Sequence, residues 1–92
     1  MKLQERLTAL REVPTATLTP ADIRLLVSQQ TRLEELVPLA LGLLAANPLL
    51  ETEVYPGDLL GALANVDLDY WGAHPDQQQR LFALRTRAKA MK

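Results

Sequence analysis

The chain has 92 residues, the length of one domain, and 48% of them are apolar although only four are aromatic, so we expect an aliphatic core. It has no cysteine and one histidine, which excludes a disulfide framework and a zinc site with three or four Cys or His ligands. The formal net charge of −1 hides a strong segregation of charge along the chain. The N-terminus lacks a secretory signal run, and the uncharged residues 36–50 are too few to span a bilayer, so we expect a cytoplasmic protein.

The N-terminal segment predicts a helix. Leu3, Leu7 and Leu10 recur at helical spacing, and this helix is expected to stop ahead of Pro14 because the residue before a proline avoids the α region. Strand signals are weak along the whole chain, since it has no sustained period-2 alternation and no Asn-Gly or Asp-Gly hairpin.

The next two helices have clear start and stop signals. The run TPAD at 19–22 supplies a capping threonine, a proline for the first helical position and a carboxylate that can bond back to the cap, which predicts a helix ending near Gln30. Residues 33–46 have almost no polar side and predict a central, enclosed helix with Pro38 in its first turns. The pair NP at 47–48 ends this helix.

Shorter elements are predicted after a loop at residues 49–55. The run PGD at 56–58 opens a short helix, and Asp67 caps another. The run HPD at 74–76 opens the last helix.

These elements predict an all-α protein, a compact bundle of five or six short helices around one enclosed central helix. Residues 1–92 are expected to form a single domain, with its core at about residues 18–84 and a basic C-terminal tail at residues 85–92.

Charge is divided among three segments. Residues 1–32 hold five bases and three acids, residues 33–79 hold eight acids and no Lys or Arg, and residues 80–92 hold five bases and no acid. About half of the charged residues in an average chain are basic, so their absence from 47 consecutive residues is unusual. The eight acids are Glu34, Glu35, Glu51, Glu53, Asp58, Asp67, Asp69 and Asp76.

Helix starts account for part of this acidic segment. Four of the aspartates fall where a helix is predicted to begin, where a carboxylate satisfies free N–H groups and complements the dipole. Glu51 and Glu53 lie in the loop and serve no helix end. An acidic surface without cations repels nucleic acid and attracts cationic proteins, so the segment predicts a protein partner.

The basic C-terminal segment allows another interpretation. Its cations could contact nucleic acid, which would make the protein a helical regulator or adaptor. Arg85, Arg87 and Lys89 also fall in the last turns of a helix, where positive charge complements the dipole, and that interpretation is favoured.

No constellation for catalysis is present in the sequence. His74 precedes a proline and is expected to pack at a helix junction, and Ser28 has no triad partners in the sequence. The glycines do not form a phosphate-binding loop, and the acids lack EF-hand spacing. We therefore expect a protein that is not an enzyme and that needs no cofactor or metal.

Several motifs in order resemble one family. The runs LEELVPLAL at 33–41, NPL at 47–49 and YPGDLL at 55–60, followed by Trp71 and HP at 74–75, are similar to immunity proteins of bacterial contact-dependent growth inhibition (CDI) systems. The resemblance covers about residues 18–84. It implies a non-catalytic protein that binds the C-terminal toxin domain delivered by a neighbouring cell, often a nuclease, and blocks it in the cytoplasm.

Two departures from the family pattern leave the identity of the toxin open. Arg32 stands where a small residue is usual, and the run QQQ at 77–79 replaces a more charged one. The run YPGD at 55–58 matches the shared pattern, and the resemblance implies that these four residues maintain the fold more than they contact the toxin.

Our hypothesis is a monomeric immunity protein whose acidic middle segment occupies the basic substrate surface of its toxin, with acidic residues in place of phosphates. The acids are expected to form one continuous surface, with tyrosines at its edge because tyrosine is favoured at interfaces. The candidate toxin-binding residues are Glu51, Glu53, Tyr55, Asp58, Asp67, Asp69 and Tyr70.

Overall fold

The computed structural model describes residues 2–10 and 12–91, with side chains from residue 5 onward, and within these residues it is entirely helical apart from loops. This confirms the prediction of an all-α fold. The elements are α1 (Lys2–Leu10), the 3-10 turn η1 (Thr15–Thr17), α2 (Pro20–Ser28), α3 (Leu33–Ala46), α4 (Asp58–Ala64), α5 (Leu68–Ala73) and α6 (Pro75–Met91). None of these helices is both long enough and apolar enough to cross a membrane.

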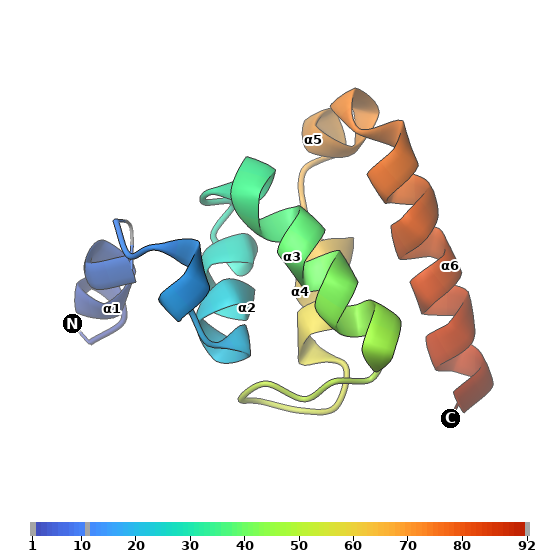
Figure 1. The fold of residues 1–92 in the computed structure, drawn as a ribbon, viewed down its shortest axis with the longest axis horizontal. Helices are drawn as coiled ribbons and strands as arrows, with labels where there is room; N and C mark the ends of the chain where they lie inside the picture. The colour runs from blue at the N-terminus through green and yellow to red at the C-terminus, as the bar shows by residue number, and fades with distance from the viewer. Residues whose placement is uncertain (1, 11, 92) are drawn as a thin grey trace.

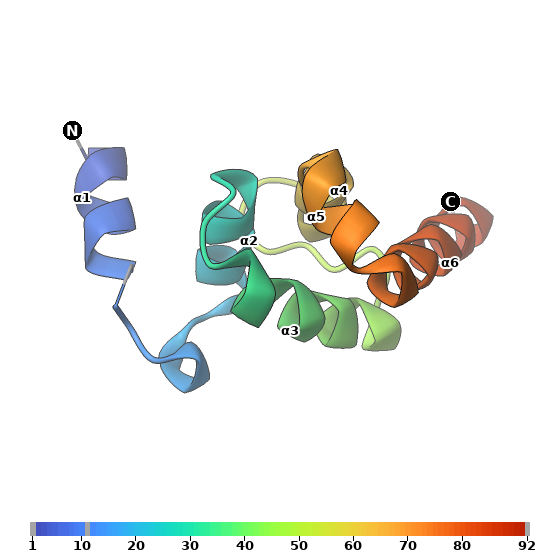
Figure 2. The same cartoon turned by 90° about the horizontal axis from the view of Figure 1, so that it is seen from above.

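The helices are arranged along one long axis of 38 Å (Figure 1). Helix α1 lies at one end of this axis and α6 at the other, so the two termini are far apart. Helix α3 crosses the middle of the molecule and packs against α2, α4 and α6. The view from above shows α3 on one side of the molecule and α4 and α5 on the other (Figure 2).

The central helix α3 is less enclosed than its sequence predicts. Leu36, Val37, Leu41 and Leu44 are completely buried, but Leu39 on another side of the helix is 42% exposed. A chain of 92 residues is too short to cover a helix from all sides, because small domains bury a smaller share of their surface.

The predicted helix start at residues 19–22 is confirmed in detail. Thr19 Oγ1 accepts a hydrogen bond from the amide of Asp22 at 3.2 Å, and the Asp22 carboxylate accepts one from the amide of Thr19 at 3.1 Å. The reversal from α2 to α3 uses left-handed backbone at Gln30 and Arg32, which no turn motif in the sequence signalled.

The core extends beyond the predicted residues 18–84 at both ends. Leu7 and Leu10 of α1 pack against it, and Ala88 of α6 belongs to it. The segment predicted to be a basic tail is helical and forms the last two turns of α6, which ends at Met91. Leu3 of the first predicted helix lies outside the described side chains, as do Lys2, Arg11 and Lys92, which are among the bases counted above.

The loop between α3 and α4 folds around the buried carboxylate of Asp58, which is 3% exposed. This carboxylate accepts hydrogen bonds of 2.7–3.0 Å from the hydroxyl and amide of Thr52 and from the amides of Glu53 and Val54. Burial by itself would raise the pKa of Asp58, but these hydrogen bonds outweigh it and hold the pKa well below its ordinary value. Gly57 precedes Asp58 and has φ +88°, a left-handed backbone conformation that would strain an L residue with a Cβ atom.

We expect Asp58→Asn to lower the free energy of unfolding by about 3 kcal/mol, because an amide cannot accept all four bonds and buried charge-assisted bonds are strong. For a domain of this size that corresponds to a fall in melting temperature of roughly 10–20 °C. Calorimetry at pH 7 measures the change. Asp76→Asn at the exposed start of α6 is the matched control and should cost at most about 1 kcal/mol, so equal losses in the two variants would contradict this role for Asp58.

Candidate functional site

The structure divides the seven candidate residues between the two ends of α4. One group lies in and after the loop at residues 49–57, at the lower edge of Figure 1, and the other lies on α5 at the upper edge. The structure therefore does not bring the seven residues together as one group. The loop group is Glu51, Glu53, Tyr55 and Asp58, and the α5 group is Asp67, Asp69 and Tyr70.

Two acids of the loop group are bound within the protein. Asp58 is buried beneath the loop and does not reach the surface. Glu53 is exposed but accepts hydrogen bonds from Arg6 at 3.1 Å and Arg24 at 3.0 Å, which lower its pKa. The buried Nε of Arg24 lies 3.7 Å from Asp58 Oδ2, so the two guanidinium groups neutralise this part of the loop.

The other two residues of the loop group are accessible. Glu51 is exposed, and its backbone forms an isolated antiparallel bridge to Pro56. Tyr55 is 52% exposed, with its hydroxyl directed at α4 near Gly61, where an added Cβ would stand 2.9 Å from it.

The α5 group is mainly at the surface. Asp67 and Asp69 are exposed and form no ion pair with any described residue. Tyr70 is buried, and its hydroxyl donates a 2.6 Å hydrogen bond to Gln77 on α6. The prediction of a surface role therefore suits the two aspartates, whereas Tyr70 joins α5 to α6.

His74 connects this end of the molecule to α3, as expected for a residue at a helix junction. Its ring stacks on Tyr70 with centroids 4.1 Å apart, Nδ1 lies 2.9 Å from the Tyr70 carbonyl oxygen, and Nε2 lies 3.0 Å from the Glu34 carboxylate. The bond to the Tyr70 carbonyl is the main cause that raises the pKa of His74, and Glu34 adds to it. The two acceptors together favour the imidazolium form, which donates from both nitrogens.

The N-terminal third of the chain supplies part of the missing positive charge. Arg6 pairs with Asp22 as well as with Glu53, and Arg32 pairs with Glu35 at 2.9 Å. Glu51, Asp67, Asp69 and Asp76 are the acids of residues 33–79 that remain exposed without an ion pair to a described residue.

The sequence interpretation missed a second accessible surface, which lies along α4 and α6. Leu68 is 82% exposed and Phe82 is 72% exposed. Beside them lie two cavities of about 160 and 270 Å³, with Arg85 in the lining of both. The helical phase of α6 contained the signal, because Phe82 falls outside the buried stripe of that helix.

These surfaces and the helical fold define a small binding protein. Among the described residues, no three His, Cys, Asp or Glu side chains are grouped so that they could hold a metal ion. The family model of CDI immunity proteins matches residues 1–81, and the chain belongs to this family. These proteins are non-enzymatic toxin inhibitors, so the chain neutralises a cognate CDI toxin, as the resemblance implied. Searches of curated proteins and of solved structures gave no match.

Glu53 and Glu51 should respond differently to charge reversal. Glu53→Lys places a third cation beside Arg6 and Arg24 and should lower the melting temperature, whereas Glu51→Lys should leave it unchanged, because Glu51 has no ion pair with a described residue. Thermal unfolding of the two variants in parallel measures this. An unchanged melting temperature for Glu53→Lys would show that the arginine pairs contribute nothing.

We expect the ion pair of His74 with Glu34 to stabilise the fold in acid and not in base. Because the pKa of His74 is raised in the folded protein, its contribution is complete below the unfolded value of about 6.5 and is lost as the pH rises through the folded pKa. Urea unfolding of wild type and Glu34→Gln at pH 5.5 and 8.5 measures the difference. His74 is the only histidine, so an NMR titration reports its pKa directly, and an ordinary pKa would refute the interaction.

Proposed function

We propose that the protein neutralises its toxin through the acidic end, defined as Asp67 immediately before α5, Asp69 in α5 and the neighbouring Asp76 of α6. We further propose that the toxin is a nuclease and that these carboxylates occupy its cationic substrate surface. The observation that supports this most directly is that the three aspartates remain exposed and free of ion pairs to the described residues, while Glu53 and Glu35 are paired.

The position of the acidic end supports the proposal. Helix α5 and the start of α6 lie at the upper edge of the molecule in Figure 1, beside the start of α3, which carries the exposed Glu34. Residues 33–79 contain no Lys or Arg, so lysine and arginine side chains reach this end only from outside that segment. Negative charge gathered on one end focuses the field and attracts a cationic partner over a distance of about one Debye length, near 8–10 Å.

A nuclease suits this chemistry because its substrate is a polyanion. Carboxylates that replace phosphates would bind the cations of the toxin and exclude the nucleic acid. We infer that the immunity protein acts as a monomer and meets its toxin in the cytoplasm of the producing cell. Glu51 at the opposite end of α4 is a second, separate acidic contact in this proposal.

Reversing the charge of the acidic end should slow binding without unfolding the protein. For Asp67→Lys with Asp69→Lys we expect the association rate with the toxin domain encoded by the adjacent upstream gene to fall about tenfold at low salt. The dependence of this rate on salt should also weaken. Stopped-flow or surface plasmon resonance at several salt concentrations measures both, and calorimetry checks the fold.

The matched control has the same change in charge at the other end of the molecule. Glu5 and Glu12 are exposed acids of the N-terminal region, so Glu5→Lys with Glu12→Lys alters the net charge equally. If both double variants slowed association alike, the effect would come from net charge and the acidic end would not be the contact. A toxin domain without nuclease activity would refute the nuclease part alone.

A further inference from the structure

We propose that the surface between α4 and α6 receives an apolar side chain of the toxin that is flanked by a carboxylate. We name this surface the α4–α6 groove and define it by Leu60, Ala64, Leu68, Phe82, Arg85 and Lys89. The proposal rests on the proposed function, since it gives the same toxin a second contact next to the acidic end.

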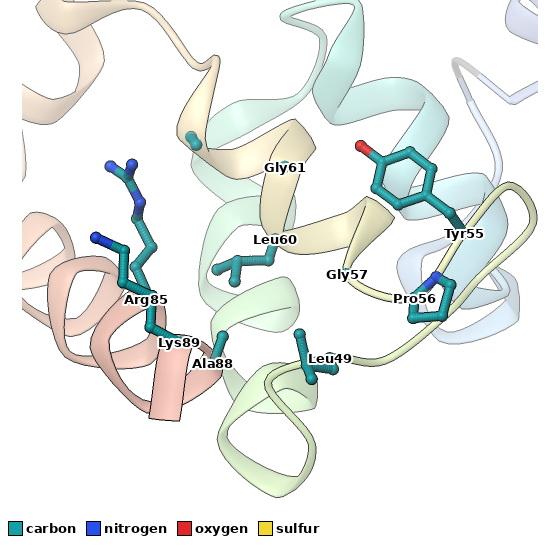
Figure 3. Close-up of a pocket in the computed structure, with 10 residues that line it drawn as sticks. Leu49, Tyr55, Pro56, Gly57, Leu60, Gly61, Arg85, Ala88 and Lys89 are labelled. Atoms are coloured by element: carbon teal, nitrogen blue, oxygen red, sulfur yellow. The ribbon is translucent and has the colours of Figure 1, made fainter. Parts of the chain in front are cut away.

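The two cavities of the groove adjoin each other, because both have Ala64 and Arg85 in their linings. The larger cavity, of about 270 Å³, lies between α6 and the loop that precedes α4. Figure 3 shows Arg85 and Lys89 of α6 on one side of this cavity, with Tyr55 on the other. The smaller cavity, of about 160 Å³, continues along α6 toward α5, where Leu68 and Phe82 line it.

The two large apolar side chains of the groove, Leu68 and Phe82, lie outside the core and are left exposed to solvent. Helix α6 buries Leu81, Leu84 and Ala88 in the core, and Phe82 stands outside that stripe at 72% exposure. Leu68 is 82% exposed at the start of α5. Exposed large apolar side chains that adjoin a cavity and are rimmed by charge mark an interaction site.

Charge complementarity identifies the occupant. Arg85 and Lys89, one helical turn apart on α6, line the groove, and no Asp or Glu lines either cavity. The matching partner segment therefore carries a carboxylate next to its apolar side chain. Leu68 lies between Asp67 and Asp69, so the apolar end of the groove adjoins the acidic end and one toxin surface can cover both.

Kinetics separate this contact from the steering role of the acidic end. With the cognate toxin domain, we expect Leu68→Ala and Phe82→Ala each to raise the dissociation rate at least about tenfold and to leave the association rate and its salt dependence nearly unchanged. Their melting temperatures should match that of wild type because both side chains are exposed. Val54→Ala is the control, since Val54 is 60% exposed and lies outside the groove.

A second pair of variants tests whether the toxin segment in the groove carries the proposed carboxylate. Arg85→Gln should raise the dissociation rate several-fold more than Arg80→Gln, which changes an exposed arginine of the same helix outside the groove. Equal effects of the two substitutions would refute a carboxylate at this position. If the Asp67→Lys and Asp69→Lys double variant does not slow association, the proposed role of the acidic end is refuted. The dissociation rates of the groove variants still decide the role of the groove separately.

Three outcomes would overturn the proposal as a whole. The first is that Leu68→Ala and Phe82→Ala bind the toxin domain as Val54→Ala does. The second is that light scattering finds a dimer of the free protein that these substitutions abolish, which would assign the groove to a second copy. The third is that the free protein shifts a single-stranded oligonucleotide and Arg85→Gln prevents it, which would assign the groove to nucleic acid.

Discussion

The hydrogen bonds to the buried carboxylate of Asp58 are the interactions on which the arrangement of the acidic segment depends. This carboxylate holds the loop between α3 and α4 against the molecule through bonds to Thr52, Glu53 and Val54. A buried carboxylate would be costly without such partners, so the loop and the start of α4 form together. The loop in turn places Glu53 within reach of the arginines of α1 and α2.

The consequence is that charges of the acidic segment take two different roles. Glu53 and Glu35 compensate arginines from the N-terminal third of the chain, and Glu34 accepts a bond from His74. Asp67 and Asp69 have no such partner among the described residues and contribute their charge to the solvent-facing end of α5. Acidic side chains thus join helices in one place and present negative charge to solvent in another.

The α4–α6 groove and the acidic end together form a surface that is partly apolar and partly charged, because Leu68 of the groove lies between Asp67 and Asp69. Steering by exposed charge acts mainly on the rate of encounter, whereas an apolar anchor in a cavity acts mainly on the lifetime of a complex. The acidic end and the groove adjoin at α5, so the two effects can operate on one partner. In the proposed mode of binding, these two contacts would let a domain of 92 residues bind its toxin without a deep cleft.

The α-helices and their order could be predicted from the sequence, because capping residues, prolines and helical periodicity act within a few residues of the chain. The starts of α2, α4 and α6 followed from such local signals, and the motif order indicated the family. Which acids form ion pairs depends instead on contacts between distant parts of the chain. Glu53 meets Arg6 across 47 positions of sequence and Arg24 across 29, and no local rule predicts such a pairing. The burial of Tyr70 also depends on tertiary packing, whereas the exposure of Phe82 follows from the helical phase of α6.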